Sequence, residues 1–453
     1  MAVGQAFSIK QRALRAGVWS LGGHFSSQLI RLASNLIMTR LLVPEMFGVM
    51  AIAWMVLAGI GLFSDLGTKQ SVIRSSRGDN PDFLNTVWAV QIIRGGLIYL
   101  AGLIASLSLY YAAKSGWFSD NTAYANPVLP LVLSLVSMTA LISGFESTRT
   151  ATASRLMAQG RLTLIEIVSQ LSGVVVMILW ALFERSIWAL VAGWITTSIV
   201  RTVSSHSRLM PGLANRWMWD KSALHEIFHF GKWVLVSSIL GFLINNGDRL
   251  LLGGLISANA LGIYVTAFFI MSSMTQVVSK ILGNVTFPVL SEMVRTSPEK
   301  LTATYYRFRL PFDIGLLFLS GLFFEAGRYA IYFLYDARYA EAGAMLQVLS
   351  LTLIAFRYNV VDQCYLAMGK PNILVALISV RVIVLFTLLP ITYKEYQMSG
   401  ALWAIVASAF SSIPLTLYFM KKLDLLDARH EFIILPVFLV GIAAGFIFEK
   451  LVA

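Results

Sequence analysis

Residues 17–41 read GVWSLGGHFSSQLIRLASNLIMTRL, an apolar run that also carries regularly spaced polar side chains. A helix needs about 20 mostly apolar residues to cross the hydrocarbon core of a bilayer. The polar side chains follow one another at steps of three or four residues, which places them on one helical face. They are Ser20, His24, Gln28, Arg31, Asn35 and Thr39. The stretch therefore predicts a transmembrane helix with one polar face.

The composition of the whole chain extends this prediction. Of 453 residues, 57% are hydrophobic and only 13% are charged, whereas a soluble protein has roughly 25% charged residues. The missing charge indicates that most of the surface faces lipid. The net charge of +12 does not indicate a nucleic-acid partner, because the basic residues lie in short segments between apolar runs.

Reading the chain for runs of this length predicts an all-α polytopic membrane protein with about thirteen (twelve to fourteen) transmembrane helices. The last run alternatively lies along the membrane interface or belongs to an additional pair of helices. The predicted spans are 17–41, 46–66, 84–112, 127–147, 161–183, 186–204, 228–247, 258–286, 307–327, 344–368, 372–393, 399–420 and 431–449.

Basic residues give this topology an orientation. With the N-terminus inside, most of the 35 Lys and Arg residues fall in inside segments, among them Arg74, Arg155 and Arg208, and few fall outside, such as Lys114. Cytoplasmic loops of membrane proteins carry this excess of positive charge. We expect a multi-pass protein of the bacterial cytoplasmic membrane with a cytoplasmic N-terminus.

The chain also contains an internal repeat. Thr39-Arg40-Leu41-Leu42 precedes Phe47-Gly48, and Asp248-Arg249-Leu250-Leu251 precedes Leu261-Gly262. Six predicted spans separate the two copies, so both halves have the same orientation, as in transporters with parallel repeats. The repeat predicts two pseudo-symmetric six-helix lobes.

The repeat and the polar junction between its halves give four predicted regions. The first lobe covers 1–205, a cytoplasmic or interfacial linker 206–227, the second lobe 228–422 and an additional helix 423–453. In the linker, Trp217 and Trp219 beside Lys221 predict an interfacial amphipathic helix. An ordinary cytoplasmic loop is the alternative.

Polar side chains inside spans are costly and usually face a bundle interior or a water-filled cavity. The eighth predicted span repeats the polar face of the first, with Gln276 and Lys280 on it, and Asn245 lies in the seventh. Matching polar faces in two halves predict a central hydrophilic cavity that includes Gln28, Asn35, Gln276 and Asn245. Hydrogen bonding between packed helices is the alternative.

Deeply placed charges suggest the cargo. Six cations are opposed by two acids, Glu166 and Asp362. An excess of cations favours an anionic cargo, because the guanidinium group of arginine can donate two parallel hydrogen bonds to phosphate oxygens. Each acid is either an ion-coupling residue or a structural partner, as Arg381 would be for Asp362. The cations are Arg31, Arg94, Lys232, Lys280, Arg357 and Arg381.

No enzyme signature accompanies these charges. The chain lacks a nucleotide-binding Gly-rich loop and the spacings of hydrolase or metalloprotease motifs. Its single cysteine, Cys364, excludes a cysteine-cluster metal site. We expect no catalytic residue, no metal and no cofactor.

Several ordered motifs resemble one known family. Trp19 to Leu29, Phe47-Gly48 and Ser64-Asp65-Leu66-Gly67 in the first half, and Asp248 to Gly253 and Phe287-Pro288-Val289-Leu290-Ser291 in the second, are similar to the Wzx-type oligosaccharide flippases. These belong to the polysaccharide transporter family of the multidrug/oligosaccharidyl-lipid/polysaccharide exporter superfamily. The resemblance covers about residues 17–295, and beyond that only the topology agrees.

The resemblance implies two six-helix bundles and a flippase that moves undecaprenyl-diphosphate-linked oligosaccharide to the periplasmic leaflet by alternating access. It implies that Arg31, Lys280, Arg94 and Arg357 receive the diphosphate or acidic sugars. The bilayer and the polymerase and chain-length regulator of the same pathway are the expected partners, with no nucleic acid. A lipid II flippase, a multidrug-type small-molecule exporter and a membrane-embedded enzyme are the alternatives.

Overall fold

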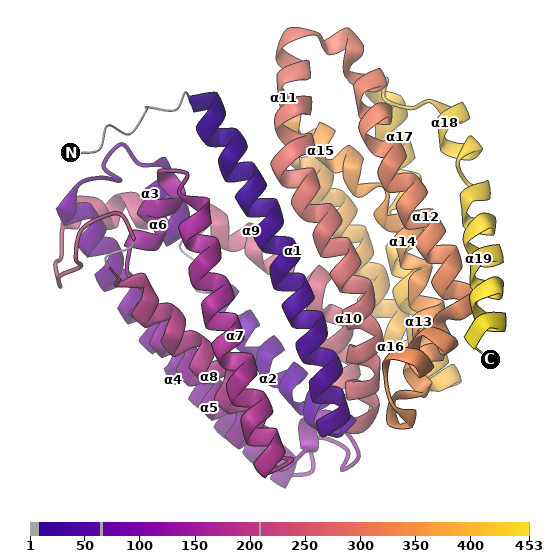
Figure 1. Cartoon of the computed structure of the whole chain (residues 1–453), viewed down its shortest axis with the longest axis horizontal. Helices are drawn as coiled ribbons and strands as arrows, with labels where there is room; N and C mark the ends of the chain where they lie inside the picture. The colour runs from indigo at the N-terminus through magenta and orange to yellow at the C-terminus, as the bar shows by residue number, and fades with distance from the viewer. Residues whose placement is uncertain (1–8, 64–66, 208–209, 453) are drawn as a thin grey trace. The chain divides into compact units, whose positions relative to one another are not determined.

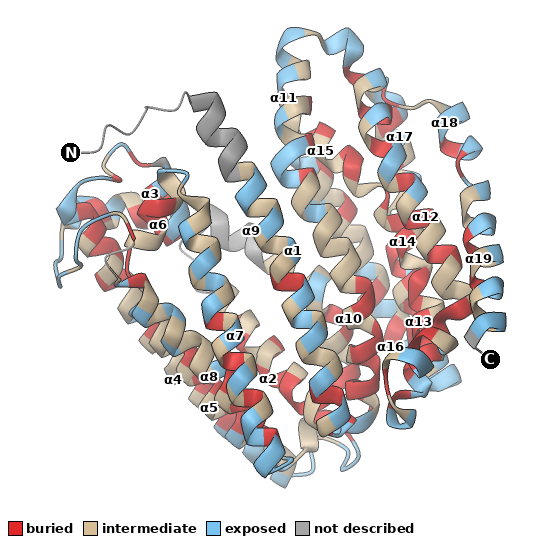
Figure 2. Ribbon diagram, in the orientation of Figure 1, coloured by how far each residue is buried: buried red, intermediate tan, exposed pale blue. Residues whose placement is uncertain are grey.

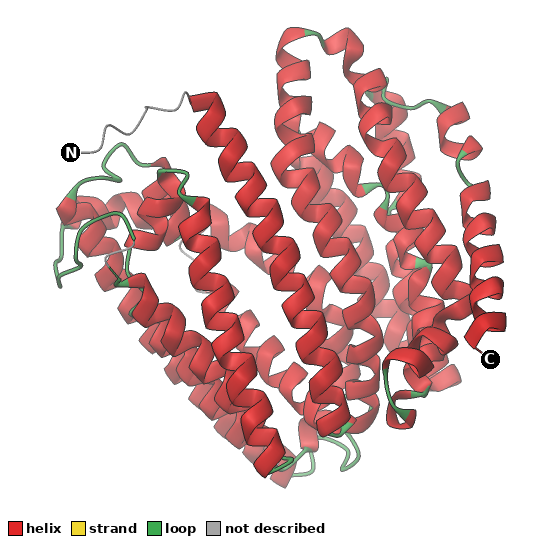
Figure 3. Cartoon of the chain, in the orientation of Figure 1, coloured by secondary structure: helices red, strands yellow, loops and turns green. Residues whose placement is uncertain are grey.

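The computed structural model describes residues 9–63, 67–207 and 210–452, and over these ranges the chain is helical with connecting loops and no strand (Figures 1 and 3). The all-helical prediction is confirmed. Chain contacts divide the molecule into two compact units. One includes the chain up to Leu42 and Val49–Phe242, and the other includes Val43–Gly48 and the chain from Leu243 onward.

In the first unit, α4 packs against α5, and α7 packs against both α1 and α8. Two short helices, α3 and α6, pack together. The helices of this unit are α1 (Ile9–Leu41), α2 (Pro44–Phe63) from Val49 onward, α3 (Thr68–Arg74), α4 (Pro81–Lys114), α5 (Leu129–Gly144), α6 (Arg149–Arg155), α7 (Gln159–Phe183), α8 (Trp188–Ser205) and the first part of α9 (Lys221–Gly253).

In the second unit, α12 is the central helix and packs along α13 and α19. The helices are the end of α9, α10 (Ala258–Ile281), the π-helical turn η2 (Leu282–Thr286), α11 (Phe287–Thr296), α12 (Leu301–Leu334), α13 (Glu341–Ser350), α14 (Thr352–Phe356), α15 (Asn359–Ala367), α16 (Pro371–Ser411), α17 (Ile413–Lys422), α18 (Ala428–Ile433) and α19 (Pro436–Val452). Short 3-10 turns are η3 (Pro298–Lys300) and η4 (Ala337–Tyr339) in this unit and η1 (Ala123–Ala125) in the first.

Local sequence explains where these helices begin and break. Pro81 starts α4 after Asn80, whose side chain accepts hydrogen bonds from the backbone of Asp82 and Phe83 at 2.8 and 3.3 Å. A proline at the first position and an Asn cap are both favoured at helix N-termini. Within α16, Gln397 has φ 51° and ψ −139°, which interrupts the helix there.

Exposed residues lie along many helices (Figure 2), and large apolar side chains are among them. Phe183 is 92% exposed and Tyr332 is 77% exposed, which fits contact with lipid. In the described part of the chain, eight helices are long and apolar enough to cross a membrane, or nine if one bent helix pair forms a span. The chain is a multi-pass membrane protein, and the count of thirteen spans stays a prediction.

The division of the chain differs from the predicted regions at the middle junction. No helix is present from 210 to 220, and α9 begins at Lys221, so the expected helix around Trp217 is wrong and the alternative of a loop holds. The first unit extends through the early part of α9 to Phe242. Bonds from the linker to neighbouring helices, described below, take the place of helical bonds.

The two glycines of the repeat meet within the second unit. A Cβ on Gly48 would lie 1.9 Å from the carbonyl oxygen of Ala258, and a Cβ on Gly262 would lie 1.8 Å from that of Pro44. The start of α2 therefore crosses the start of α10 in a symmetric backbone contact that leaves no room for a side chain. The glycines that mark the sequence repeat are required by this close approach.

Candidate functional site

The polar face of α1 separates into exposed and buried parts. Arg31 is exposed, Asn35 is partly exposed and Gln28 is buried. Thr39 is also buried and donates a hydrogen bond back to the carbonyl oxygen of Asn35 at 2.9 Å. Arg31 is therefore the cation that this face presents at the surface of the first unit.

Helix α7 supplies polar neighbours to this face. The hydroxyl of Ser27 donates to Oε1 of Gln170 at 2.9 Å, and the amide of Gln170 donates to the carbonyl oxygen of Ser27 at 3.3 Å. One turn from each of these residues lie Arg31 and Glu166, which are both exposed and interact electrostatically. The α1–α7 surface thus carries a cation and an acid close enough to influence each other.

Arg94 on α4 has a structural contact. Its guanidinium donates to the carbonyl oxygen of Gly61 at 2.8 Å, and Gly61 lies in the last turn of α2. This hydrogen bond joins α4 to α2, which is a structural role that needs no cargo.

In the second unit, the predicted polar face of α10 becomes more exposed toward its C-terminal end. Thr266 is buried, Gln276 and Lys280 are partly exposed, and Asn284 is exposed. Asn284 lies in the π-helical turn η2, where the backbone N–H of Phe287 bonds to the carbonyl of Leu282. Such turns occur frequently at functional sites. Asn245, also predicted to line the cavity, is exposed on α9.

The motif Asp248 to Gly253 at the end of α9 packs this helix against α10. Tyr264 on α10 donates a hydrogen bond to the buried carboxylate of Asp248, and the guanidinium of Arg249 lies over the ring of Phe268 at 4.1 Å. Asp248 opens the second copy of the sequence repeat, and Tyr264 lies two residues after its Leu261-Gly262. Their contact joins α9 to α10 and explains why the motifs occur together.

Arg357 lies in a buried ion network rather than at an exposed surface. Its exposed fraction is 3%, and its Nη2 lies 3.2 Å from Oε2 of Glu431 while its Nη1 lies 3.7 Å from Oδ2 of Asp313. Arg309, which is 1% exposed, forms a two-pronged contact with Glu431 and lies 3.0 Å from Asp313. Two arginines and two carboxylates neutralise each other inside the second unit.

Three tyrosine hydroxyls complete the network. Tyr306 and Tyr358 each donate to Glu431 at 3.1 Å, and the hydroxyl of Tyr305 accepts from Arg309 at 2.7 Å. Buried charges are tolerated only when paired and hydrogen-bonded. The network connects α12, the end of α14 and α18, so it holds the C-terminal helices to the unit.

Sequence reasoning missed most of this network. Arg309, Asp313 and Glu431 were not among the predicted site residues. One local signal was present: Arg309 and Asp313 are four residues apart at the start of an apolar run, the spacing of a helical ion pair. Glu431 carried no such signal, because its partners lie 122 and 74 positions away in sequence.

The second predicted coupling acid, Asp362, lies in α15 and is partly exposed. It interacts electrostatically with Arg381 of α16, in line with the expected neighbour. The backbone of Arg381 also accepts a hydrogen bond from Ser408 at 2.7 Å. Lys232, a further predicted deep cation, lies among the residues of α9 whose side chains are not described.

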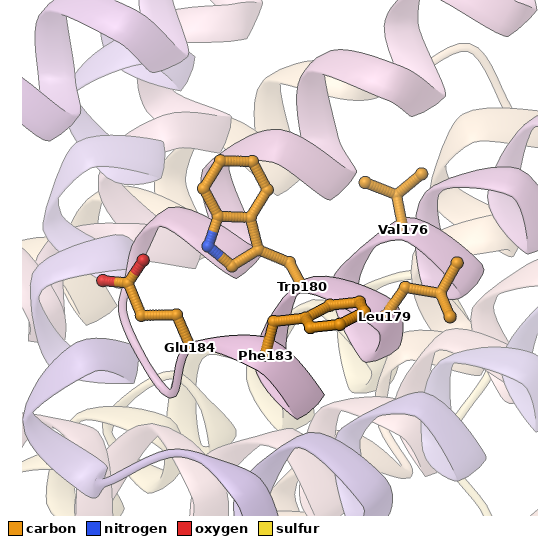
Figure 4. Close-up of a pocket in the computed structure, with 5 residues that line it drawn as sticks. All are labelled: Val176, Leu179, Trp180, Phe183 and Glu184. Atoms are coloured by element: carbon orange, nitrogen blue, oxygen red, sulfur yellow. The ribbon is translucent and has the colours of Figure 1, made fainter.

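A surface pocket of about 400 Å³ lies at the end of α7 (Figure 4). Its lining is mostly apolar and includes none of the predicted site residues. Among the described residues, no group of three or more His, Cys, Asp or Glu is arranged to hold a metal ion. The pocket is lined by Val176, Leu179, Trp180, Phe183 and Glu184.

Comparisons with known proteins agree with the fold and the motifs. Two curated relatives are an uncharacterized membrane protein in the cps region of Klebsiella pneumoniae, 20% identical over 92% of this chain and 83% of its own length, and the lipopolysaccharide biosynthesis protein WzxC of Escherichia coli, 20% identical over 70% of this chain and 63% of its own length.

Two solved structures share the fold at low identity. One is an inward-facing multidrug resistance MATE family transporter of the MOP superfamily, with a TM-score of 0.66, 13% identity and coverage of 90% of this chain and 98% of that one. The other is the lipid II flippase MurJ in an inward closed conformation, with a TM-score of 0.64, 14% identity and coverage of 96% and 98%.

The family model described as "Polysaccharide biosynthesis protein" matches residues 37–310, which is more than half of the chain. This range includes the exposed Arg31–Glu166 surface only in part, but it contains both glycines of the repeat and the Asp248–Tyr264 pair. The chain therefore belongs to the polysaccharide biosynthesis protein family, as its Wzx-type resemblance predicted.

Proposed function

We propose that this chain is a flippase that moves undecaprenyl-diphosphate-linked oligosaccharide from the cytoplasmic to the periplasmic leaflet by alternating access. The oligosaccharide would be a repeat unit of O-antigen, capsule or exopolysaccharide. Membership of the polysaccharide biosynthesis family supports a transporter in such a pathway. The observation that supports an anionic cargo is Arg31, an exposed guanidinium in the middle of an apolar helix.

The physical reason is the cost of moving a diphosphate and several sugars through hydrocarbon. Each polar group that loses its hydrogen bonds there costs several kcal/mol. A cation at a wet surface offsets this cost, because arginine binds phosphate oxygens through two N–H groups. The lipid tail stays in the bilayer and needs no polar path.

We rank the residues proposed to bind cargo by their exposure. Arg31 and Lys280 remain, with Asn35, Gln276 and Asn245 as exposed or partly exposed polar neighbours on α1, α10 and α9. Arg94 and Arg357 each have the protein contacts described above, and Gln28 is buried. We therefore propose binding roles for Arg31 and Lys280 first.

The test of the cargo charge is export by Arg31→Ala and Lys280→Ala. Loss of a charged hydrogen bond of about 1.5–3 kcal/mol would lower export roughly 10- to 100-fold. Arg31→Lys and Lys280→Arg keep the charge and should retain more activity. Cell-surface glycan is measured at matched protein level, with Arg185→Ala as an exposed-cation control. If both alanine variants exported as much glycan as the unmutated protein, the proposal would be contradicted.

Substrate choice separates this function from the alternatives of lipid II or small-molecule export. Proteoliposomes are loaded with a diphosphate-linked oligosaccharide, with lipid II or with a cationic dye, and movement of each is measured. We expect the first to be translocated fastest. Faster movement of lipid II or of the dye would favour the corresponding alternative.

Glu166 is proposed as a coupling residue because its charge acts on Arg31. Neutralising it should change the gradient dependence of flipping more than the affinity for cargo. Flipping by Glu166→Gln and Asp362→Asn is compared with and without an imposed proton or sodium gradient. A parent protein indifferent to both gradients would leave neither acid a role in coupling.

The proposed orientation places Lys114 outside and Arg161 inside. Cys364 is buried, so single cysteines introduced at these two exposed positions can be labelled selectively. A membrane-impermeant maleimide added to intact cells should modify Lys114→Cys and spare Arg161→Cys. The opposite pattern would reverse the topology.

A further inference from the structure

One end of the first unit carries a surface that the proposed transport does not use. It is formed by α3, α6 and the non-helical segment 211–220, here called the collar. Helix α4 begins at Pro81, shortly after α3, and α7 begins at Gln159, shortly after α6. Both are apolar enough to cross a membrane, so the collar lies where two spans leave the bilayer.

Arginine side chains hold the collar together from within. Nη1 of Arg155 donates to the carbonyl oxygens of Val72, Ile73 and Ser75 at 3.0, 3.0 and 2.6 Å, which joins the end of α6 to the end of α3. Arg149 donates in the same way to backbone carbonyls of the linker at 2.9 to 3.1 Å. These two cations are therefore structural.

The linker is bound to the helices beneath it along its length. Oδ1 of Asn215 accepts from the hydroxyl of Ser147 at 2.6 Å, and its amide donates to the hydroxyl of Thr148 at 2.6 Å. Asp220 pairs with Arg77 at 2.7 Å. A segment fixed at both ends in this way presents its remaining side chains in set positions.

An apolar core lies under the collar. It combines one or more side chains from α3, α4, α6 and the start of α9, namely Val72, Phe83, Leu84, Val87, Val90, Ala151, Ala223 and Ile227. These residues are all buried. The collar therefore packs on a hydrophobic core of its own. The apolar side chains on its solvent-exposed surface do not belong to that core.

Those outer apolar side chains are concentrated in the linker. Trp217 is 62% exposed, Leu213 is 52% exposed and Trp219 is 51% exposed. Leu213 lies over α6, because its carbonyl accepts from Arg149, and Leu156 and Met157 at the end of α6 are also exposed. Tryptophan favours the interface between hydrocarbon and water, where its ring is buried and its N–H meets headgroups.

Cations surround the same side chains. Arg216 and Lys221 flank the two tryptophans, Arg161 is in the first turn of α7, and all three are exposed. Basic residues beside a membrane attract anionic lipids by about 1 kcal/mol each. Asp220, the acid between them, is already paired with Arg77.

We propose that the collar is a membrane-docking surface that inserts Trp217 and Trp219 into the headgroup layer and binds anionic phospholipid headgroups through Arg216 and Lys221. A lipid surface fits better than a protein partner because spans α4 and α7 leave the bilayer at the collar itself. Docking here anchors the first unit by a rigid loop and does not depend on the cargo.

The first test measures where the tryptophan positions lie. Trp217→Cys and Trp219→Cys, labelled with an environment-sensitive fluorophore, are placed in nanodiscs of phosphatidylcholine with or without phosphatidylglycerol; buried Cys364 is left unlabelled. We expect blue-shifted emission, quenching by lipid-borne quenchers and stronger quenching with phosphatidylglycerol. Asn121→Cys, in an exposed polar turn, is the water-facing control.

The second test measures the role of charge. Arg216→Glu combined with Lys221→Glu should abolish the phosphatidylglycerol effect at position 217, whereas Arg216→Lys combined with Lys221→Arg should keep it. Emission at positions 217 and 219 that matches the water-facing control in every nanodisc would overturn the proposal. A phosphatidylglycerol effect that charge reversal leaves unchanged would also overturn it. Protection that occurs only when two copies share a disc would indicate a protein contact and also overturn it.

Discussion

Arg31 and Arg357 both lie in the middle of apolar runs, but Arg31 is exposed in the first unit and Arg357 is buried in the second. In the first unit Arg31 is exposed on α1 and shares its surroundings with the exposed acid Glu166. In the second, Arg357 is 3% exposed and lies among Glu431, Asp313 and Arg309. Arg31 thus lies on an exposed helix face beside one acid, whereas Arg357 is buried with two acids and a second arginine.

This difference shows that a charge in an apolar helix has two distinct physical explanations. A water-exposed cation keeps its solvation and can exchange partners. A dry cation is stable only if acids and hydroxyls satisfy it, because desolvation of each ion costs several kcal/mol. The same residue type in an apolar helix can therefore be exposed or internally paired, and burial distinguishes the two cases.

The largest expected effect is on the stability of the second unit. Glu431→Gln leaves Arg309 and Arg357 without their shared carboxylate, and removal of one partner from a buried ion pair costs about 3–5 kcal/mol. The melting temperature in detergent should fall clearly. Asp336→Asn is the matched control: it breaks the exposed pair with Arg338, which contributes no more than about 1 kcal/mol. Equal melting temperatures for the two variants would contradict the difference in stability between the buried network and the exposed pair.

Alanine substitution at each of the two arginines tests the comparison directly. Arg357→Ala should destabilise the protein by at least about 1.5–3 kcal/mol, the range for a lost charged hydrogen bond, because Arg309 still contacts both acids but supplies only one of the two positive charges. Arg31→Ala should leave the melting temperature near that of the parent while lowering export. Thermal unfolding and export are measured on the same preparations. A destabilised Arg31→Ala with normal export would reverse the assignment.

Arg94 offers an intermediate case, partly exposed but bound to the end of α2. Arg94→Ala removes a cation from the last turn of that helix, which costs about 0.3–1 kcal/mol and up to ~2 kcal/mol in partly buried geometry. Arg94→Lys keeps the charge and should retain most of the stability. The melting temperatures of the two variants are compared with the parent. Loss of export without loss of stability would return Arg94 to the cargo-binding set.

The smallest effect is expected at the surface, where pH acts on the linker. Hydrogen bonds from Ser222 and Arg77 hold the pKa of Asp220 below its ordinary value. A lowered carboxylate pKa adds stability above the unfolded pKa of about 3.9, and that stability is lost as pH falls through the lower folded value. Limited proteolysis of the linker should therefore accelerate in acid below about pH 4. Asp220→Asn should remove this pH dependence, and an unchanged acid response in that variant would contradict the assignment.

Much of the molecule followed from composition and spacing. The shortage of charge and the long apolar runs indicated helices in a membrane, because only structures that satisfy every backbone hydrogen bond internally can cross one. The repeat marked Gly48 and Gly262, which the structure brings into contact. These properties are local in sequence or repeat along it, so they can be read without knowing the fold.

Tertiary structure alone decided what each charge contacts. Arg31 and Arg357 look alike in sequence, and the acid that neutralises Arg357 lies 74 positions away on α18. The loop from 210 to 220 was expected to be helical, but Asn215, Arg149 and Arg77 bind it in another conformation. Pairing and burial depend on which helices meet, and no periodicity within one helix carries that information.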